Sequence, residues 1–198
     1  MIAVDRLLWK LRQPRSRASE LISLQKRVAI EAGKRISTEE RALALEVRAK
    51  KLAVTAALTA VTSCAKCDHG DPYKGGACCG GNTADLFDER ELALLVHAGT
   101  TVDDLTPPRG ADPHVGCAFR GPTGCTQGLA HRPGRCVHYM CDIIKRELHG
   151  RGELVAIEAK LQDLNATVQR YFAVYRERTD REVLEPIVDA IRASDRSR

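Results

Sequence analysis

The segment LVAIEAKLQDLNATVQRYFAVY, residues 154–175, carries the clearest periodic pattern in the chain. Its large apolar side chains recur at alternating spacings of three and four residues, which places them along one seam of a helix. They are Leu154, Ile157, Leu161, Leu164, Val168, Tyr171 and Tyr175. A seam of this kind stays exposed to water unless a second helix covers it. The segment therefore predicts a long helix packed against a partner helix.

The segment from residue 38 to residue 62 is the expected partner helix. Ser37 and Glu40 form a capping box at its start, in which each side chain satisfies a backbone N–H group of the other residue. One face of the Ala/Leu/Val-rich stretch that follows carries Val47, Val54, Leu58 and Val61. Because the two helices flank a cysteine-rich region, an antiparallel pair would bring the ends of that region together. The alternative is a homodimeric coiled coil through the 154–175 seam.

Shorter helices are expected towards both ends of the chain. The residue before a proline avoids the helical conformation, so a first short helix should end before Pro14. A second helix should run from about residue 16 to residue 32. A last short helix is expected after residue 178, broken or restarted near Pro186.

The stretch between the two long helices, residues 64–149, begins with CAKCDHGDPYKGGACCGG and holds all 8 cysteines of the chain. Only 15 of its 86 residues are Leu, Ile, Val or Phe, which is below the roughly 20% under which a chain struggles to bury a core. Its one clear helix should begin at a capping box of Asp88 and Glu91 and end at Gly99. Such a module needs another source of stability, and bound metal is the usual one.

The cysteines have spacings typical of metal ligands. They are Cys64, Cys67, Cys78, Cys79, Cys117, Cys125, Cys136 and Cys141. A Cys-x2-Cys turn directs two thiolates at one ion, and eight thiolates suit two zinc sites or a four-cysteine iron–sulfur cluster with further thiols beside it. The adjacent residues Cys78 and Cys79 serve one centre only if the backbone turns tightly. Otherwise they serve two centres, or one of them is not a ligand.

Several histidines lie near these cysteines in the sequence. They are His69, His114, His131 and His138. Each is expected to be a surface or supporting residue rather than a ligand. The sequence has no Walker A loop, no His-Glu-x-x-His motif and no Gly-x-Ser-x-Gly motif. The function classes that these motifs define are therefore not indicated.

The net charge of +5 is unevenly distributed along the chain. Residues 1–51 hold 13 Lys and Arg against 6 Asp and Glu, whereas residues 52–198 hold 18 against 20. A basic N-terminal arm indicates a solvated helical face, or a surface for nucleic acid or an acidic partner. Basic and acidic residues are mixed along it, so we expect the solvated face, and we expect residues 1–35 to be dispensable for metal binding.

The sequence predicts a cytoplasmic protein. No run of eighteen apolar residues is long enough to span a membrane, and Asp5, Arg6 and Lys10 interrupt any signal-peptide apolar region. Thiols stay reduced in the cytosol, where clustered cysteines are more often metal ligands than disulfides.

The order of the cysteine motifs is similar to that of a known family. The motifs are CAKC, CCGG, LFDERELALL, GCAFRGPTGC and RPGRCVHYMC, within residues 64–146. In this order they resemble the YkgJ-type cysteine-cluster family, also called CxxCxxCC, which is described as a zinc- or iron-chelating domain. The resemblance implies that all eight cysteines coordinate metal. The chain differs in having ten residues between Cys67 and Cys78, where the family name implies two.

These observations together predict a mainly α fold: a helical hairpin of N- and C-terminal helices that carries a small irregular cysteine-rich metal-binding module. The expected regions are 1–63, 64–149 and 150–198. The expected function is binding of zinc or iron, including an iron–sulfur cluster, with a structural or redox-active role. The alternatives are an enzyme that uses the cluster, as in the methylase-like relatives of the family, and a zinc-stabilised adaptor. Such an adaptor would bind a protein partner or nucleic acid through its helical regions.

Overall fold

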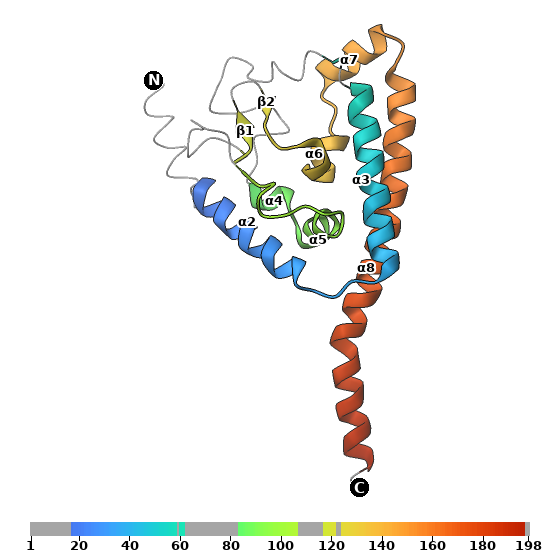
Figure 1. Ribbon diagram of the computed structural model, residues 1–198. Coiled ribbons are helices and arrows are strands. Elements are labelled where there is room, and N and C mark those ends of the chain that lie inside the picture. Colours follow the sequence, from blue (N-terminus) through green and yellow to red (C-terminus); the bar gives the residue numbers. More distant parts are fainter. Residues whose placement is uncertain (1–16, 59, 62–82, 107–116, 122–123, 197–198) are drawn as a thin grey trace, which may run out of the picture.

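The computed structural model describes residues 17–58, 60–61, 83–106, 117–121 and 124–196, and it is mainly helical (Figure 1). The helices are α2 (Arg17–Ala32), α3 (Thr38–Leu58), α4 (Thr83–Leu86), α5 (Glu89–His97), α6 (Gly134–His138), α7 (Asp142–Gly150) and α8 (Leu154–Arg196). A short 3-10 helix, η2 (Leu129–His131), follows an antiparallel pair of two-residue strands, β1 (Arg120–Gly121) and β2 (Gly124–Cys125). Among the described residues, no helix is long and apolar enough to cross a membrane.

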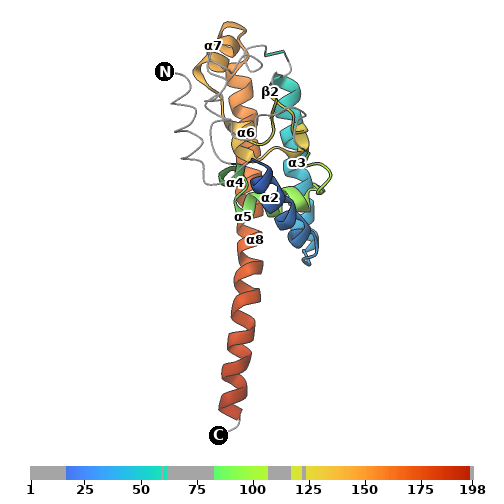
Figure 2. The ribbon, with the colours of Figure 1, turned by 90° about the vertical axis from the view of Figure 1, so that its left-hand side faces the viewer.

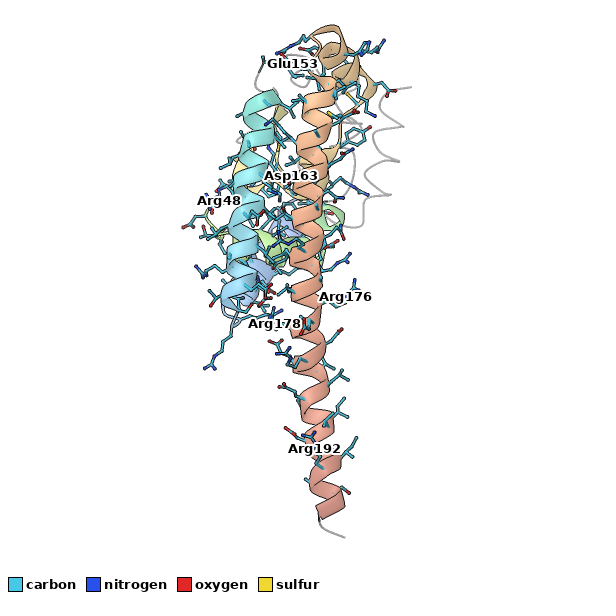
Figure 3. All side chains as sticks on the ribbon, turned by 90° about the vertical axis from the view of Figure 1, so that its right-hand side faces the viewer. Arg48, Glu153, Asp163, Arg176, Arg178 and Arg192 are labelled. Atoms are coloured by element: carbon cyan, nitrogen blue, oxygen red, sulfur yellow. The ribbon has the colours of Figure 1, made fainter. Side chains whose placement is uncertain are left out.

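Helices α3 and α8 form an antiparallel hairpin, which Figures 1 and 2 both show. Lys50 Nζ lies 2.7 Å from Asp163 Oδ1 in the upper half of the pair. At the other end, Arg178 Nε donates to Glu40 Oε1 at 2.8 Å, beside the first turn of α3 (Figure 3). The predicted pairing of these two helices is therefore confirmed.

The apolar seam of α8 is covered within the same chain. Six of its seven side chains are buried, and the seventh, Leu154, is partly buried against them. We call the apolar cluster that they join the hairpin core. Its other buried members are Leu43, Ala44, Val47, Val54, Ala93, Leu94, Ala98, Val137, Ile144 and Leu148. The cluster thus includes residues of the cysteine region as well as of the two long helices.

Helix α3 begins with the predicted capping box. The Ser37 N–H group donates to Glu40 Oε2 at 2.9 Å, and the Glu40 N–H group donates to Ser37 Oγ at 3.0 Å. The helix ends at Leu58, earlier than the expected residue 62, which lies outside the described residues. The expected apolar face is correct, since Val47 and Val54 are buried.

Helix α5 also has its predicted boundaries, but one predicted contact is wrong. Asp88 Oδ1 accepts from the Glu91 N–H group at 2.8 Å, as a capping residue does. Gly99 has a φ of 95°, and Thr100 donates its N–H to the Leu95 carbonyl, which closes the helix with a Schellman motif. The Glu91 carboxylate, however, does not complete the capping box. It accepts instead from residues of two other elements, Lys51 and Gly134.

The C-terminal end of the chain differs from the expectation of a separate short helix. Helix α8 runs without a break from Leu154 to Arg196 with Pro186 inside it. A proline removes one helical hydrogen bond and strains the preceding turn, and that is not enough to end this helix. Every described side chain from residue 180 to residue 194 is exposed, so the end of α8 extends past the rest of the molecule (Figure 1). The first short helix expected before Pro14 lies outside the described residues.

A second core joins α2 to the elements that follow it in the cysteine region. Its buried members are Leu21, Leu24, Val28, Leu86, Phe87, Leu92, Leu95, Leu105, Cys117 and Phe119. Helix α2 therefore shares an apolar core with Cys117 and Phe119. Deleting α2 would expose this core. That residues 1–35 are dispensable for metal binding stays a prediction.

Candidate metal centre

The structure describes four of the eight predicted ligands. Cys64, Cys67, Cys78 and Cys79 lie outside the described residues, so the question raised by the adjacent pair stays open. Cys117 is buried, and Cys125, Cys136 and Cys141 are half-buried. No disulfide joins these four cysteines to one another.

The four described cysteines fall into two neighbourhoods. Cys117, Cys125 and Cys136 lie at the second core, whereas Cys141 packs against the hairpin core. Among the described residues, no three His, Cys, Asp or Glu side chains come close enough together to hold one ion. The structure thus brings Cys117, Cys125 and Cys136 to one side of the molecule without forming a ligand set from them alone. The eight-cysteine ligand set remains a prediction.

Arg132 ties together the segments that carry Cys125 and Cys136. Its Nε donates to the Gln127 carbonyl at 3.0 Å, and its Nη2 donates to the Cys125 carbonyl at 3.3 Å. Its own carbonyl accepts from Lys51 Nζ at 3.0 Å. One residue therefore connects β2, the turn before Cys136, and the long helix α3.

A buried ion pair lies under this turn. Lys51 Nζ is 3.1 Å from Glu91 Oε1, and the same oxygen accepts from the Gly134 N–H group at 2.6 Å. A Cβ atom on Gly134 would lie 3.1 Å from the other Glu91 oxygen, so a side chain there would crowd the Glu91 carboxylate. The pair anchors the start of α6, two residues before Cys136. Sequence reasoning missed it, because Lys51 lies in a basic stretch that we expected to be solvated.

A second polar link fixes the neighbourhood of Cys117. The buried Glu20 of α2 accepts from the Thr83 N–H group at 3.1 Å. Thr83 in turn accepts from the Ala118 N–H group through its hydroxyl at 3.0 Å. The residue next to Cys117 is thereby held to α4, and α4 is held to α2.

The two described histidines nearest the cysteines have different surroundings. His131 Nδ1 is 3.0 Å from Thr100 Oγ1, and its Nε2 is 3.5 Å from Asp104 Oδ1. Burial lowers the pKa of His131, and the Asp104 carboxylate only partly opposes this. His138 Nδ1 is 2.9 Å from the Gly134 carbonyl oxygen, whereas its Nε2 is buried without a hydrogen-bond partner among the described residues. His69 and His114 lie outside the described residues.

A pocket of about 290 Å³ lies beside Cys136. Its wall is largely apolar and comes from the end of α3 and from residues 129–144. The lining residues are Thr55, Leu58, Val61, Leu129, Arg132, Cys136, Val137, Tyr139, Met140 and Ile144. Cys136 and Arg132 thus line a small and largely apolar space.

A buried polar cluster lies elsewhere, between α2, α3, α5 and α8. The Tyr171 hydroxyl is 2.6 Å from His97 Nδ1, and His97 Nε2 is 3.3 Å from a Glu31 carboxylate oxygen. Burial lowers the pKa of His97, although Glu31 and Glu40 oppose the shift. Burial also raises the pKa of Tyr175 to about 12. Burial in this cluster therefore opposes the charged forms of both His97 and Tyr175.

Whether the described residues fit a metal can be judged from their donors. Thiols at the rim of an apolar core suit soft or borderline ions such as zinc and iron. The buried Nε2 of His138, with no hydrogen-bond partner among the described residues, is a further donor atom in the same region. The site therefore fits such a metal in the chemistry of its donors.

Comparison with protein-family models, with curated proteins and with solved structures finds no match to the chain. The similarity to the YkgJ-type family therefore rests on the cysteine motifs alone.

Proposed function

We propose that the chain is a metal-binding protein of the zinc- or iron-chelating cysteine-cluster type. Its eight cysteines hold zinc or iron, including iron in an iron–sulfur cluster, and the bound metal organises residues 64–149. The similarity of the cysteine motifs to the YkgJ-type family supports the same reading.

The observation that carries the proposal is the concentration of all eight cysteines in one stretch of sequence, parts of which the structure holds in place. Every cysteine lies within residues 64–141. Two of the described ones lie next to backbone segments held by buried charged groups: Glu20 acts through Thr83 beside Cys117, and the Lys51–Glu91 pair acts before Cys136. Buried charges fix geometry at a cost in desolvation, and a fixed backbone is what a metal site needs from its surroundings.

Metal analysis with a visible absorption spectrum, on full-length protein purified without oxygen, tests the proposal. Bound iron with sulfide and broad visible absorption would indicate an iron–sulfur cluster, and bound zinc without colour would indicate a structural site. Cys125→Ser and Cys136→Ser should each lower the metal content per chain, because a hydroxyl replaces a soft thiolate poorly. A folded protein with reactive thiols that contains no zinc or iron, and that takes up neither metal when it is supplied, would rule the proposal out.

The adjacent pair can be tested in the same assay. Neighbouring side chains diverge unless the backbone turns tightly, so Cys78→Ser and Cys79→Ser should differ in the metal they lose. Matching losses of the same ions from both variants would place both thiolates on one centre.

An enzyme that uses the cluster is the second candidate, and the pocket beside Cys136 favours it. A small apolar molecule bound there would lie next to a predicted ligand. Met140→Trp should fill this space while leaving the metal content unchanged. Compounds that raise the melting temperature of the wild type through this pocket should then have no effect on the variant.

A further inference from the structure

We propose that His138 is a ligand of the metal centre through its Nε2 atom, so that the centre contains a nitrogen donor beside its thiolates. The inference rests on the proposed function and departs from our expectation that the histidines near the cysteines are surface or supporting residues. His138 ends helix α6, between Cys136 and Cys141 in the sequence.

The hydrogen bond at Nδ1 determines which nitrogen carries the proton. Nδ1 lies 2.9 Å from the Gly134 carbonyl oxygen. A carbonyl oxygen can only accept a hydrogen bond, so Nδ1 is the donor, and Nε2 of the neutral ring holds a lone pair. A lone pair on one ring nitrogen is what a metal ion binds.

The orientation of the ring is fixed by the buried ion pair. The Gly134 N–H group donates to Glu91 Oε1 at 2.6 Å, and Lys51 binds that same oxygen. Gly134 is itself buried. Its carbonyl, which holds His138, therefore belongs to a peptide segment that α3 and α5 hold in place.

The Nε2 atom has no compensation from the described protein. It is buried, and no hydrogen-bond donor among the described residues reaches it. Leaving a buried polar atom unpaired is unfavourable, because the atom has lost its hydration without gaining a partner. Histidines that ligate metals typically bond their other nitrogen to a backbone carbonyl or a carboxylate, which matches the arrangement at Nδ1. With a metal ion on Nε2, each of the two ring nitrogens would have a partner.

The other described histidines have different surroundings. Both nitrogens of His131 lie near protein partners, Thr100 and Asp104. His97 Nε2 is also buried without a hydrogen bond, but a Glu31 carboxylate oxygen lies 3.3 Å from it, and the Tyr171 hydroxyl is bound at Nδ1. His149 is exposed on α7. His131 is the matched control, because it belongs to the same region and lies five residues before Cys136.

A mixed set of thiolates and one imidazole is a known donor set for zinc, and imidazole also replaces thiolate on iron in some clusters. The test compares full-length wild type, His138→Gln, His138→Cys and His131→Gln, each purified without oxygen. Metal per chain and metal affinity are measured for all four. His138→Gln should lower the affinity by at least about tenfold, His138→Cys should retain metal because thiolate is also a ligand, and His131→Gln should match the wild type.

Spectroscopy adds a readout that a purely structural role would not change. For a zinc centre, exchange with Co²⁺ should give visible bands that shift in His138→Cys, where sulfur replaces nitrogen, and stay in place in His131→Gln. For an iron–sulfur centre, pulsed electron paramagnetic resonance of the reduced protein should detect coupling to an imidazole nitrogen that disappears in His138→Cys. Unchanged metal affinity in His138→Gln together with an unchanged spectrum in His138→Cys would overturn the inference. A wild type that binds no metal would instead overturn the proposed function.

Discussion

The Nζ atom of Lys51 lies 3.1 Å from Glu91 Oε1, and the Lys51 side chain is only 1% exposed. The lysine comes from α3 and the glutamate from α5, and their shared contacts with Arg132 and Gly134 reach the turn before Cys136. The pair therefore connects the helical scaffold to the cysteine region through charge rather than through apolar contact alone.

Replacing one member of this pair should be strongly destabilising. Lys51→Met leaves the Glu91 carboxylate without its cation in a site closed to water, which should lower the free energy of unfolding by about 3–5 kcal/mol. Lys50→Met is the control, because Lys50 makes its ion pairs with Glu46 and Asp163 at the surface, and it should cost about 1 kcal/mol or less. Urea unfolding followed by circular dichroism measures both. Equal losses from the two variants would show that the Lys51–Glu91 pair has no special role.

Helix α8 allows a buried leucine to be compared with an exposed one in the same helix. Leu164 is 0% exposed and Leu184 is 56% exposed. Leu164→Ala should cost about 2–5 kcal/mol, because it opens a cavity in the hairpin core. Leu184→Ala should change stability by less than about 0.5 kcal/mol. A marked loss of stability in Leu184→Ala that grows with protein concentration would instead show that this part of α8 is covered by another copy of the chain.

His97 should make stability depend on pH. Burial lowers its pKa in the folded state below the usual 6.5, so the unfolded chain takes up the proton first as the pH falls. The contribution of His97 to the free energy of unfolding is therefore full above about pH 6.5. It declines between pH 6.5 and the lower pKa of His97 in the folded state. Urea midpoints measured between pH 5 and pH 7.5 should fall less steeply in His97→Gln than in the wild type.

His131, whose pKa is also lowered by burial, contributes in the same direction, so some slope should remain in His97→Gln. The exposed His149 is the control, and His149→Gln should keep the full slope. A wild-type slope retained in His97→Gln would exclude His97 as its source.

Substitutions at two glycines distinguish the cost of backbone strain from the cost of steric crowding. Gly99 has a φ of 95° and Gly152 a φ of 70°, so a side chain at either position is strained. A Cβ atom at Gly99 would also lie 3.1 Å from Arg48 Nη1, while nothing lies within 4 Å at Gly152. We expect Gly152→Ala to cost about 1 kcal/mol from strain alone. Gly99→Ala should cost more, since it disturbs the bond from Arg48 to the Ala98 carbonyl, and thermal unfolding compares the two.

The parts of the fold that sequence predicted well are those set by local patterns. The seam of α8, the capping box at Ser37 and Glu40, and the glycine end of α5 each follow from spacing within a few residues. The break near Pro186 was wrong, because a single proline weakens a long helix without ending it.

The surroundings of the candidate site were harder to predict from the sequence, because the contacts that hold them join residues far apart in the chain. Lys51 meets Glu91 across 40 positions, and Glu20 meets Thr83 across 63. No local pattern marks such contacts. Glu20 and Lys51 were expected on a solvated face, because charged residues are usually solvated, and Glu91 was expected in a capping box. The special status of His138 was hidden for a related reason. It depends on a hydrogen bond and on burial, neither of which residue spacing reveals.

The length of α8 has a consequence for its amide hydrogen exchange. Its 43 residues extend for about 64 Å at 1.5 Å per residue. The stretch of α8 up to Arg178 opens only when the hairpin core opens. The stretch after Arg178 is exposed, and an isolated helix of its length is only marginally stable in water. Exchange should therefore be slow in the first half of one uninterrupted helix and fast in the second. The transition should lie close to Arg178, where the last bond to α3 is made.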